Sequence, residues 1–391
     1  MNLSLRVRSL AAVTASMAIS AMVFGFTFPM FSTRLHEMGL SDAMIGYSTS
    51  AQSGGVFLVA WFAPLLVTRF GAVNVMLAMT VTKVTAVLLC IVFPGYWPWL
   101  ALRLVIGAAG SVLWIAGETW INEIAEEKSR GRELAIYSAA LGLGTMIGIK
   151  IVDVVGIHGA LPFLVLAGVV AAAALPLLFV LRDGPKLDLA GHSLGLAGFV
   201  ASFRMAPLAI FLNAAFAIIF VSVQTFIPIY GLELGLELER TLDLLIVFNL
   251  GGIVLPYLAG WLADKIDRAL LGSLMVLLCL MLFVVMGQAL VVPTVDFIYI
   301  FLLGGIAASI YAIALALLGE GFRGAALASA TASFTLMWNL GGFFGPSIVG
   351  EAMDTAGPEG LPAALAILSA LILPFALIGW LRRRRRAWAA S

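Results

Sequence analysis

Residues 260–268 read GWLADKIDR, a short charged turn between two long apolar runs. Because charged side chains are costly inside a bilayer, this pattern predicts a tight turn at a membrane surface. A weaker copy, PLLVTRFG, lies at residues 64–71. Asp264 and Thr68 hold the same place in the two copies and lie 196 residues apart, close to half of the 391-residue chain. The sequence therefore predicts two similar halves.

The composition is that of a multi-pass membrane protein. The chain is 62% hydrophobic and 11% charged, with a mean hydropathy of +1.09, which excludes a soluble globular protein. Cys90 and Cys279 lie inside apolar spans, which predicts core packing and neither a metal site nor a redox pair. There is no Gly-rich nucleotide loop and no His and Cys cluster, so we predict no cofactor, no nucleic-acid binding and no enzymatic activity.

Twelve segments reach the length of about 20 mainly apolar residues that a membrane span needs. In the first half they cover residues 10–31, 44–67, 73–93, 99–121, 134–154 and 160–181. In the second half they cover residues 207–230, 242–263, 269–290, 297–318, 325–350 and 361–380. We expect an all-α membrane protein with twelve transmembrane helices in two six-helix halves, residues 1–181 and 207–391. A cytoplasmic linker over residues 182–206 joins them.

The loop cations predict the orientation, since cytoplasmic loops carry an excess of Lys and Arg. With the N-terminus inside, Arg34 and Arg240 are the loop cations that fall outside, and the others fall inside. Both termini are then cytoplasmic, in a bacterial inner membrane. The run of five arginines at residues 382–386 follows the last span and is interpreted as a topological anchor in an Arg-rich tail.

A second pair of loops repeats at nearly the same spacing. Residues 127–132 read EKSRGR and residues 321–324 read GFRG, which places Arg130 and Arg323 193 residues apart. Two repeats in the same direction predict parallel halves. The turn GWLADKIDR is similar to the cytoplasmic loop between the second and third helices of each half in the major facilitator superfamily (MFS).

This resemblance implies a secondary transporter in which the charged turns act as gate latches. Asp264, Lys265 and Arg268 are the implied latch residues of the second half, with Arg69 in the first. Thr68 stands where the acid is expected in the first copy, so that copy departs from the family pattern. Without the resemblance, a solvated turn would explain these residues as well.

Arg103 opens RLVIG at residues 103–107, which resembles an R-x-x-x-G motif often linked to proton coupling in this family. A lone Arg in hydrocarbon needs a partner. Lys150 and Asp153 are three residues apart and share a helix face, so we predict a network of Arg103, Lys150 and Asp153. The alternative is an Arg103 side chain that reaches the outer surface. Lys83, in the middle of the third span, has either a structural or a substrate role.

Glu118 belongs to WIAGETWINE at residues 114–123 and lies about 22 Å along the helix from Arg103. It is predicted to be a gate carboxylate for Arg69, Arg130 or Arg132, or else a proton site. The W-I-x-x-E-x-W-I-N pattern resembles a sparsely characterised bacterial branch of the superfamily.

Aromatic and amide side chains are the candidates for contact with a solute. By family analogy, spans one, four, seven and ten line the path. The candidates at mid-depth are Phe24, Phe28, Trp114, Tyr137, Phe220, Gln224, Asn249, Tyr311, Trp338 and Asn339. Helix packing is the alternative interpretation for each ring. Together they suggest stacking faces and hydrogen bonds for a flat, weakly charged ring compound.

The resemblance favours uptake of a small organic nutrient, such as a flavin-like vitamin, by proton symport or facilitated diffusion in a monomer. The first span carries no acid and the fifth has no G-x-x-x-G-P, unlike many proton-driven drug exporters of the family. The G-x-x-x-G-P at residues 341–346, in the eleventh span, is interpreted as close packing with a kink. Efflux of drugs or metabolites is the alternative function, and a non-transporting sensor or scaffold is a remote one.

Overall fold

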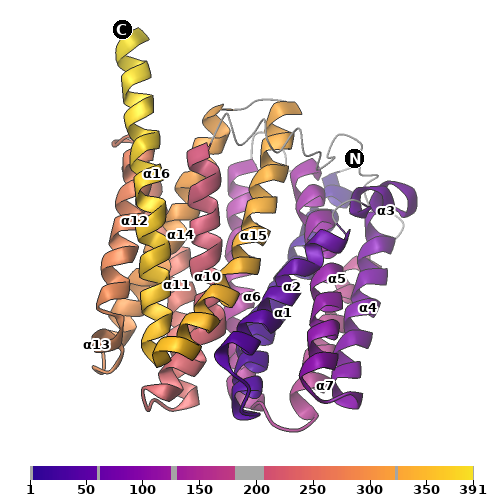
Figure 1. Cartoon of the computed structure of the whole chain (residues 1–391). Helices are drawn as coiled ribbons and strands as arrows, with labels where there is room; N and C mark the ends of the chain where they lie inside the picture. Colours follow the sequence, from indigo (N-terminus) through magenta and orange to yellow (C-terminus); the bar gives the residue numbers. More distant parts are fainter. Residues whose placement is uncertain (1–2, 60–61, 125–129, 181–206, 322–324, 391) are drawn as a thin grey trace. The chain divides into compact units, whose positions relative to one another are not determined.

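The computed structural model describes residues 3–59, 62–124, 130–180, 207–321 and 325–390, and these residues are almost entirely helical (Figure 1). The first helices are α1 (Leu3–Glu37), α2 (Asp42–Val59), α3 (Ala63–Phe70), α4 (Ala72–Val92), α5 (Tyr96–Ile124), α6 (Arg130–Val155), α7 (Leu161–Ala172) and α8 (Ala174–Leu178). The others are α10 (Pro207–Glu233), α11 (Leu238–Ala263), α12 (Arg268–Val284), α13 (Met286–Leu290), α14 (Val295–Gly321), α15 (Ala325–Ala356), the 3-10 turn Gly357–Glu359 and α16 (Gly360–Ala390).

Each predicted span coincides with one helix or with two consecutive ones. Within the described residues, nine helical segments are long and apolar enough to cross a membrane, and one of them, Ser333–Leu381, reaches from α15 into α16. The spans predicted at 160–181 and 269–290 are each divided, into α7 with α8 and α12 with α13, and the span predicted at 44–67 covers parts of α2 and α3. The prediction of an all-α membrane fold is confirmed. The predicted linker, residues 182–206, lies outside the described part of the chain.

The two charged turns owe their sharpness to local backbone chemistry. Gly71 separates α3 from α4 with a φ of +81°, a conformation that glycine adopts without strain. In the second turn, the Asp267 carboxylate accepts a hydrogen bond of 2.9 Å from the backbone NH of Leu270 and so caps α12. Each turn therefore ends one helix and starts the next within a few residues.

The helices form two compact units, Met1–Gly39 with Ala51–Ser193, and Leu40–Ser50 with Leu194–Ser391. In the first unit α1 packs along α6, and α4 packs on α5 and α7. In the second, α10 packs along α15, and α12 packs on α14 and α16, which Figure 1 shows in yellow beside α12. The same pairings recur in the same order. Residues 40–50 count with the second unit because the start of α2 packs on α15, where the backbone NH of Asp42 donates to Asp354 Oδ1 at 2.7 Å.

Glycine pairs let equivalent helices cross at backbone contact in both units. A Cβ atom added at Gly107 would lie 1.8 Å from the Gln52 carbonyl oxygen, and one added at Gly55 would lie 2.3 Å from the Ala108 nitrogen. In the second unit, a Cβ added at Gly251 or Gly304 would lie 2.0 Å from a carbonyl oxygen of the facing helix. Gly55 and Gly251 are 196 residues apart, and Gly107 and Gly304 are 197 apart. The crossing of α2 with α5 is therefore repeated by α11 with α14.

The crossing of α1 with α6 is repeated in the same way by α10 with α15. Gly144 and Gly148 on α6 face the carbonyl oxygens of Ala18 and Met22, with added Cβ atoms at 2.2 and 2.0 Å. Gly341 and Gly345 lie 197 residues further along the chain. Cβ atoms added there would lie 2.8 Å from the Ala214 carbonyl oxygen and 3.0 Å from the Ile218 Cα. The close packing predicted for the G-x-x-x-G-P at residues 341–346 is confirmed.

Replacing Gly304 by alanine is expected to destabilise the fold by about 1–3 kcal/mol, because the methyl group overlaps the Phe248 carbonyl oxygen. The matched control is Gly319→Ala on the same helix, where no atom lies within 4 Å of the added carbon and alanine improves helix propensity. Thermal unfolding in detergent measures both changes. A G304A midpoint equal to that of G319A would contradict the close crossing.

Candidate functional site

Five aromatic rings of the second unit contact one another, and we call them the aromatic cluster. They are Phe216 and Phe220 on α10, Tyr311 on α14, and Phe334 and Trp338 on α15. The ring centroid of Phe216 lies 5.2 Å from that of Trp338 and 5.4 Å from that of Tyr311. Phe216 and Phe334 are buried, whereas the other three keep part of their surface accessible. The cluster thus offers stacking faces rather than a closed core.

A buried pair of amides adjoins the aromatic cluster. Gln224 lies one turn after Phe220 on α10, and its Nε2 donates to Asn249 Oδ1 on α11 at 3.1 Å. Asn249 Nδ2 donates to the Leu245 carbonyl at 2.8 Å, which fixes the orientation of the Asn249 amide. The orientation of the Gln224 amide follows, because the reverse one would place its oxygen against Asn249 Oδ1. Among the described residues, Gln224 Oε1 accepts no hydrogen bond. A buried acceptor without a donor is costly, so a donor supplied by a ligand or water would stabilise it.

Three aromatic residues predicted in the first unit are counterparts of cluster residues. Phe24 lies 196 residues before Phe220, and Trp114 lies 197 before Tyr311. Tyr137 likewise lies 197 before Phe334, and both are buried. Trp114 Nε1 donates to Glu118 Oε1 at 2.8 Å, and the Phe24 and Phe28 rings lie 4.3 Å apart. The duplication therefore places aromatic rings at matching positions in both units.

Asn339 has a contact within its own helix, since its Nδ2 donates to the Thr335 carbonyl at 2.8 Å. It follows Trp338 on α15 and is partly exposed. Its predicted role in binding a solute stays a prediction.

Arg103 is fully buried in α5. Its Nε donates to Gln52 Oε1 at 3.1 Å, and its guanidinium carbon lies 4.9 Å from the centre of the Phe31 ring. Such a stack is favourable for a guanidinium away from water. Lys150 and Asp153 are brought together as predicted, with 2.6 Å between Nζ and Oδ2. The network of all three residues stays a prediction.

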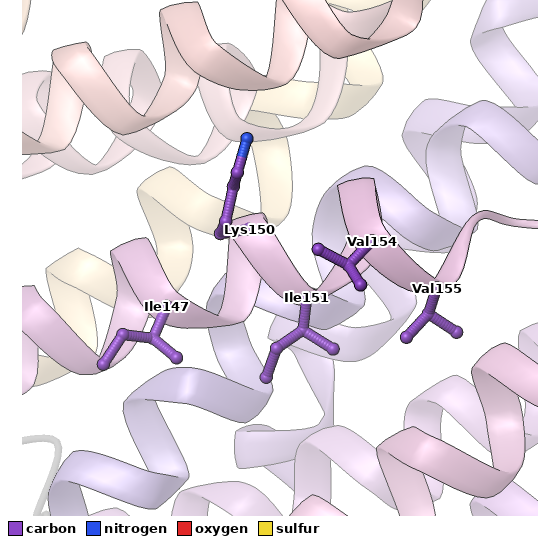
Figure 2. A pocket seen from close by; sticks show the side chains of 5 residues that line it. All are labelled: Ile147, Lys150, Ile151, Val154 and Val155. Carbon is purple, nitrogen blue, oxygen red and sulfur yellow. The ribbon is translucent and has the colours of Figure 1, made fainter.

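A shallow hollow of about 280 Å³ lies beside Lys150 on α6. Figure 2 shows Lys150 extending away from Ile147 and Ile151, and Val154 and Val155 complete the lining. Solute sites combine an apolar surface with several convergent polar groups. This hollow has one charged group and aliphatic side chains, so it does not make a solute site by itself.

The turn at residues 260–268 forms a charged contact between helices. Arg268 Nη1 lies 2.7 Å from Glu320 Oε1 on α14, and its Nη2 lies 3.6 Å from Asp264 Oδ1. Lys265 Nζ lies 3.5 Å from the centre of the Trp261 ring. In the first unit, Arg69 contacts the Phe70 ring at 5.4 Å, while the side chain of Arg130 lies outside the described part of the chain. Glu320 was missed from the sequence, although it directly precedes the repeated GFRG loop.

Two further ion pairs were not foreseen from the sequence. Arg240 at the start of α11 donates to Asp296 Oδ2 on α14 from Nε and Nη2, at 2.9 and 2.6 Å. Its guanidinium carbon also lies 3.8 Å from the centre of the Phe297 ring. In the first unit, Arg6 on α1 pairs with Glu133 on α6. Both pairs join the ends of different helices, so their role is to hold those ends together.

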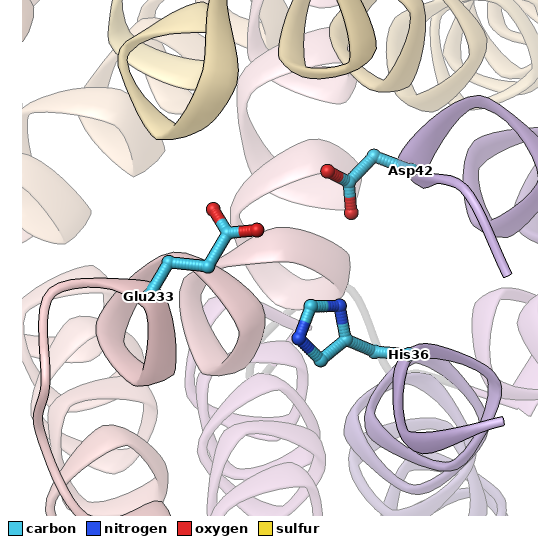
Figure 3. Close-up of side chains that lie close together, drawn as sticks. All are labelled: His36, Asp42 and Glu233. Carbon is cyan, nitrogen blue, oxygen red and sulfur yellow. The ribbon is translucent and has the colours of Figure 1, made fainter. Parts of the chain in front are cut away.

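Asp42 and Glu233, both in the second unit, have carboxylate oxygens within 4.8 Å of one another (Figure 3). His36, also drawn there, belongs to the first unit. Two partly accessible acids provide too few ligands for a dedicated cation site, since Ca²⁺ takes six to eight oxygens. We assign no metal to this pair.

The comparisons with known proteins agree on one family. The family model described as Major Facilitator Superfamily matches residues 13–346. The chain is 28% identical over 267 residues to the uncharacterized MFS-type transporter YfkF of Bacillus subtilis (strain 168), covering 64% of this chain and 65%, just under two thirds, of that relative. It is 26% identical over 286 residues to the uncharacterized MFS-type transporter YcaD of Salmonella enteritidis PT4, covering 72% of each protein.

Two solved structures share the fold. A mutant of the nucleoside transporter NupG matches with a TM-score of 0.82 at 12% identity, covering 95% of this chain and 99% of that chain. A bacterial homologue of the human lysosomal transporter Spinster, in an inward-facing and unoccupied conformation, matches with a TM-score of 0.72 at 14% identity, covering 96% of each.

Proposed function

Because this chain belongs to the major facilitator superfamily, we propose that it carries a flat, weakly charged ring compound across the membrane by alternating access. The chain is a multi-pass membrane transport protein and not an enzyme. In this proposal residues 1–181 and 207–391 are the moving halves, residues 182–206 are a cytoplasmic linker, and both termini face the cytoplasm. The W-I-x-x-E-x-W-I-N pattern would mark its branch of the superfamily.

The aromatic cluster is the observation that carries the proposal. Three of its rings are partly accessible, and Gln224 Oε1 beside them lacks a donor among the described residues. Aromatic faces and a single hydrogen-bond acceptor suit a planar heterocycle with an N–H group. An aliphatic or highly charged solute would gain little from such a surface.

The direction of transport and its coupling are inferred from the sequence. The first span has no acid and the fifth no G-x-x-x-G-P, which favours uptake over drug export, by proton symport or facilitated diffusion. A flavin-like vitamin fits the ring requirement. NupG is a nucleoside transporter, and nucleosides also contain a planar ring, although at 12% identity the likeness to NupG concerns the fold.

The turn at residues 260–268 is proposed as a latch that holds the closed cytoplasmic side. Arg268 contacts both Asp264 and Glu320, so it ties the start of α12 to the end of α14. Asp264 is 75% exposed, and exposed ion pairs contribute little to stability. Its carboxylate is therefore available to change partners during transport.

A thermal-shift screen of the purified protein against vitamins, nucleosides and related ring compounds should find ligands that raise the unfolding midpoint. Trp338→Leu should weaken the binding of these ligands about tenfold, because one stacking face is lost. The control is Trp97→Leu in the first unit, whose tryptophan is 72% exposed and outside the aromatic cluster. Equal effects of the two variants, or ligands without any ring, would refute the proposed substrate class.

Asp264→Asn should reduce the uptake of a ligand from that screen into proteoliposomes severalfold, with an unchanged unfolding midpoint, because the residue is exposed and weakly paired. Glu239→Gln, an exposed acid at the opposite end of α11, serves as control and should transport normally. Full activity of D264N would remove the latch role.

A further inference from the structure

Lys83 lies in the middle of a membrane-spanning helix. It is the twelfth of the 21 residues of α4, so about 17 Å of helix precedes it and about 14 Å follows it. The residue is only 6% exposed. A lysine side chain is too short to bring its ammonium to either membrane surface from this depth. The charge is therefore held inside the first unit.

The described part of the chain supplies no counter-charge for this ammonium. In the part of the chain that the structure describes, Lys83 takes part in no ion pair and no hydrogen bond. Thr80, one turn earlier, donates its hydroxyl to the Met76 carbonyl at 2.8 Å, and Ser111 donates to the Gly107 carbonyl at 2.9 Å. Each hydroxyl oxygen could still accept a hydrogen bond, but neither accepts one from Lys83 within the described residues. A buried cation without a partner is costly, so an anion from outside the chain would be stabilising.

Gly110 leaves room for such an anion. A Cβ atom added at Gly110 would have one neighbour within 4 Å, the Nζ atom of Lys83 at 3.6 Å. Gly110 is itself partly accessible. The ammonium therefore ends beside a stretch of α5 that has no side chain to cover it.

The second unit shows that the fold does not need a charge at this position. Buried positions on α4 correspond to buried positions on α12 that lie 196 residues later, for example Val73 and Ala269. By the same spacing, Cys279 is the counterpart of Lys83. Cys279 is fully buried and apolar. The register of 197 between α5 and α14 likewise pairs Gly110 with Ala307, which is also fully buried. The helices of the second unit therefore pack at this position without an amine.

We propose that the Lys83 ammonium binds the carboxylate of the transported solute. This inference rests on the proposed function and narrows its substrate class to ring compounds that carry one acidic group. A neutral ring compound of the same size would leave the ammonium unpaired and would bind more weakly.

The test uses benzoate and benzamide, which share ring and size but differ in charge. Their binding to the purified full chain is measured by the shift in unfolding midpoint. Wild-type protein should bind benzoate at least tenfold more tightly than benzamide, and Lys83→Met should bind the two equally. Arg8→Met is the control, since Arg8 is an exposed cation of the same unit, and it should keep the preference for benzoate.

The stability of the variant without ligand is a second measurement. K83M should unfold at or above the wild-type midpoint, because its counterpart position in α12 is apolar. A K83M protein that fails to fold, a wild type without preference for benzoate, or a K83M protein that keeps the preference would overturn the proposal. Binding of uncharged ring compounds and its loss in Trp338→Leu test the aromatic cluster of the second unit separately, so the proposed function and the role of Lys83 can fail independently.

Discussion

Backbone contact between helices at glycine pairs is the constraint on which the rest of this structure depends. In a bilayer, lipid provides no hydrophobic drive for helices to associate, so close packing must supply it. Carbonyl oxygens and glycine Cα atoms meet where α2 crosses α5 and where α11 crosses α14. The same contact recurs for α1 with α6 and α10 with α15. Because these crossings fix the rotation of each helix, they decide which side chains share a face.

The two units share one helix arrangement but differ in the side chains at matching positions. At matching positions the first unit has Phe24 and Trp114, and the second has Phe220 and Tyr311, so aromatic faces are common to both. The buried cations, by contrast, occur in the first unit and have no charged counterpart in the second. Arg103 corresponds to Ile300 and Lys83 to Cys279, and both counterparts are fully buried and apolar. Differences of this kind, on a shared scaffold, mark side chains that packing does not require.

The sequence predicted the spans and the charged turns well, since both depend on local properties. Span lengths follow from the apolar runs, and the turn predicted at residues 260–268 lies at the junction of α11 and α12. The N-cap that Asp267 provides there was not predicted. The repeat of 196 residues was also visible from the sequence. The break at Val285 between α12 and α13 was not predicted, because the apolar run continues through it.

Contacts between helices were the part that sequence reasoning could not supply. Arg240 was placed in an outer loop, but its pairing with Asp296 depends on how α11 and α14 are rotated against each other. Glu320 was overlooked for the same reason. The hydrogen bond between Gln224 and Asn249 likewise depends on the helix faces that the glycine crossings bring together. Their part in binding a solute, like that of the other candidate residues, stays a prediction.

The central claim is that two parallel copies of one six-helix unit make up the chain, and the sidedness of its two charged turns tests it most directly. Single cysteines at Arg69 and Lys265 can be labelled with a membrane-impermeant maleimide from each side of the membrane. The native Cys90 and Cys279 are buried and should react little. The account predicts that both engineered cysteines react from the cytoplasmic side alone. Labelling of the two positions from opposite sides would mean inverted halves and would contradict it.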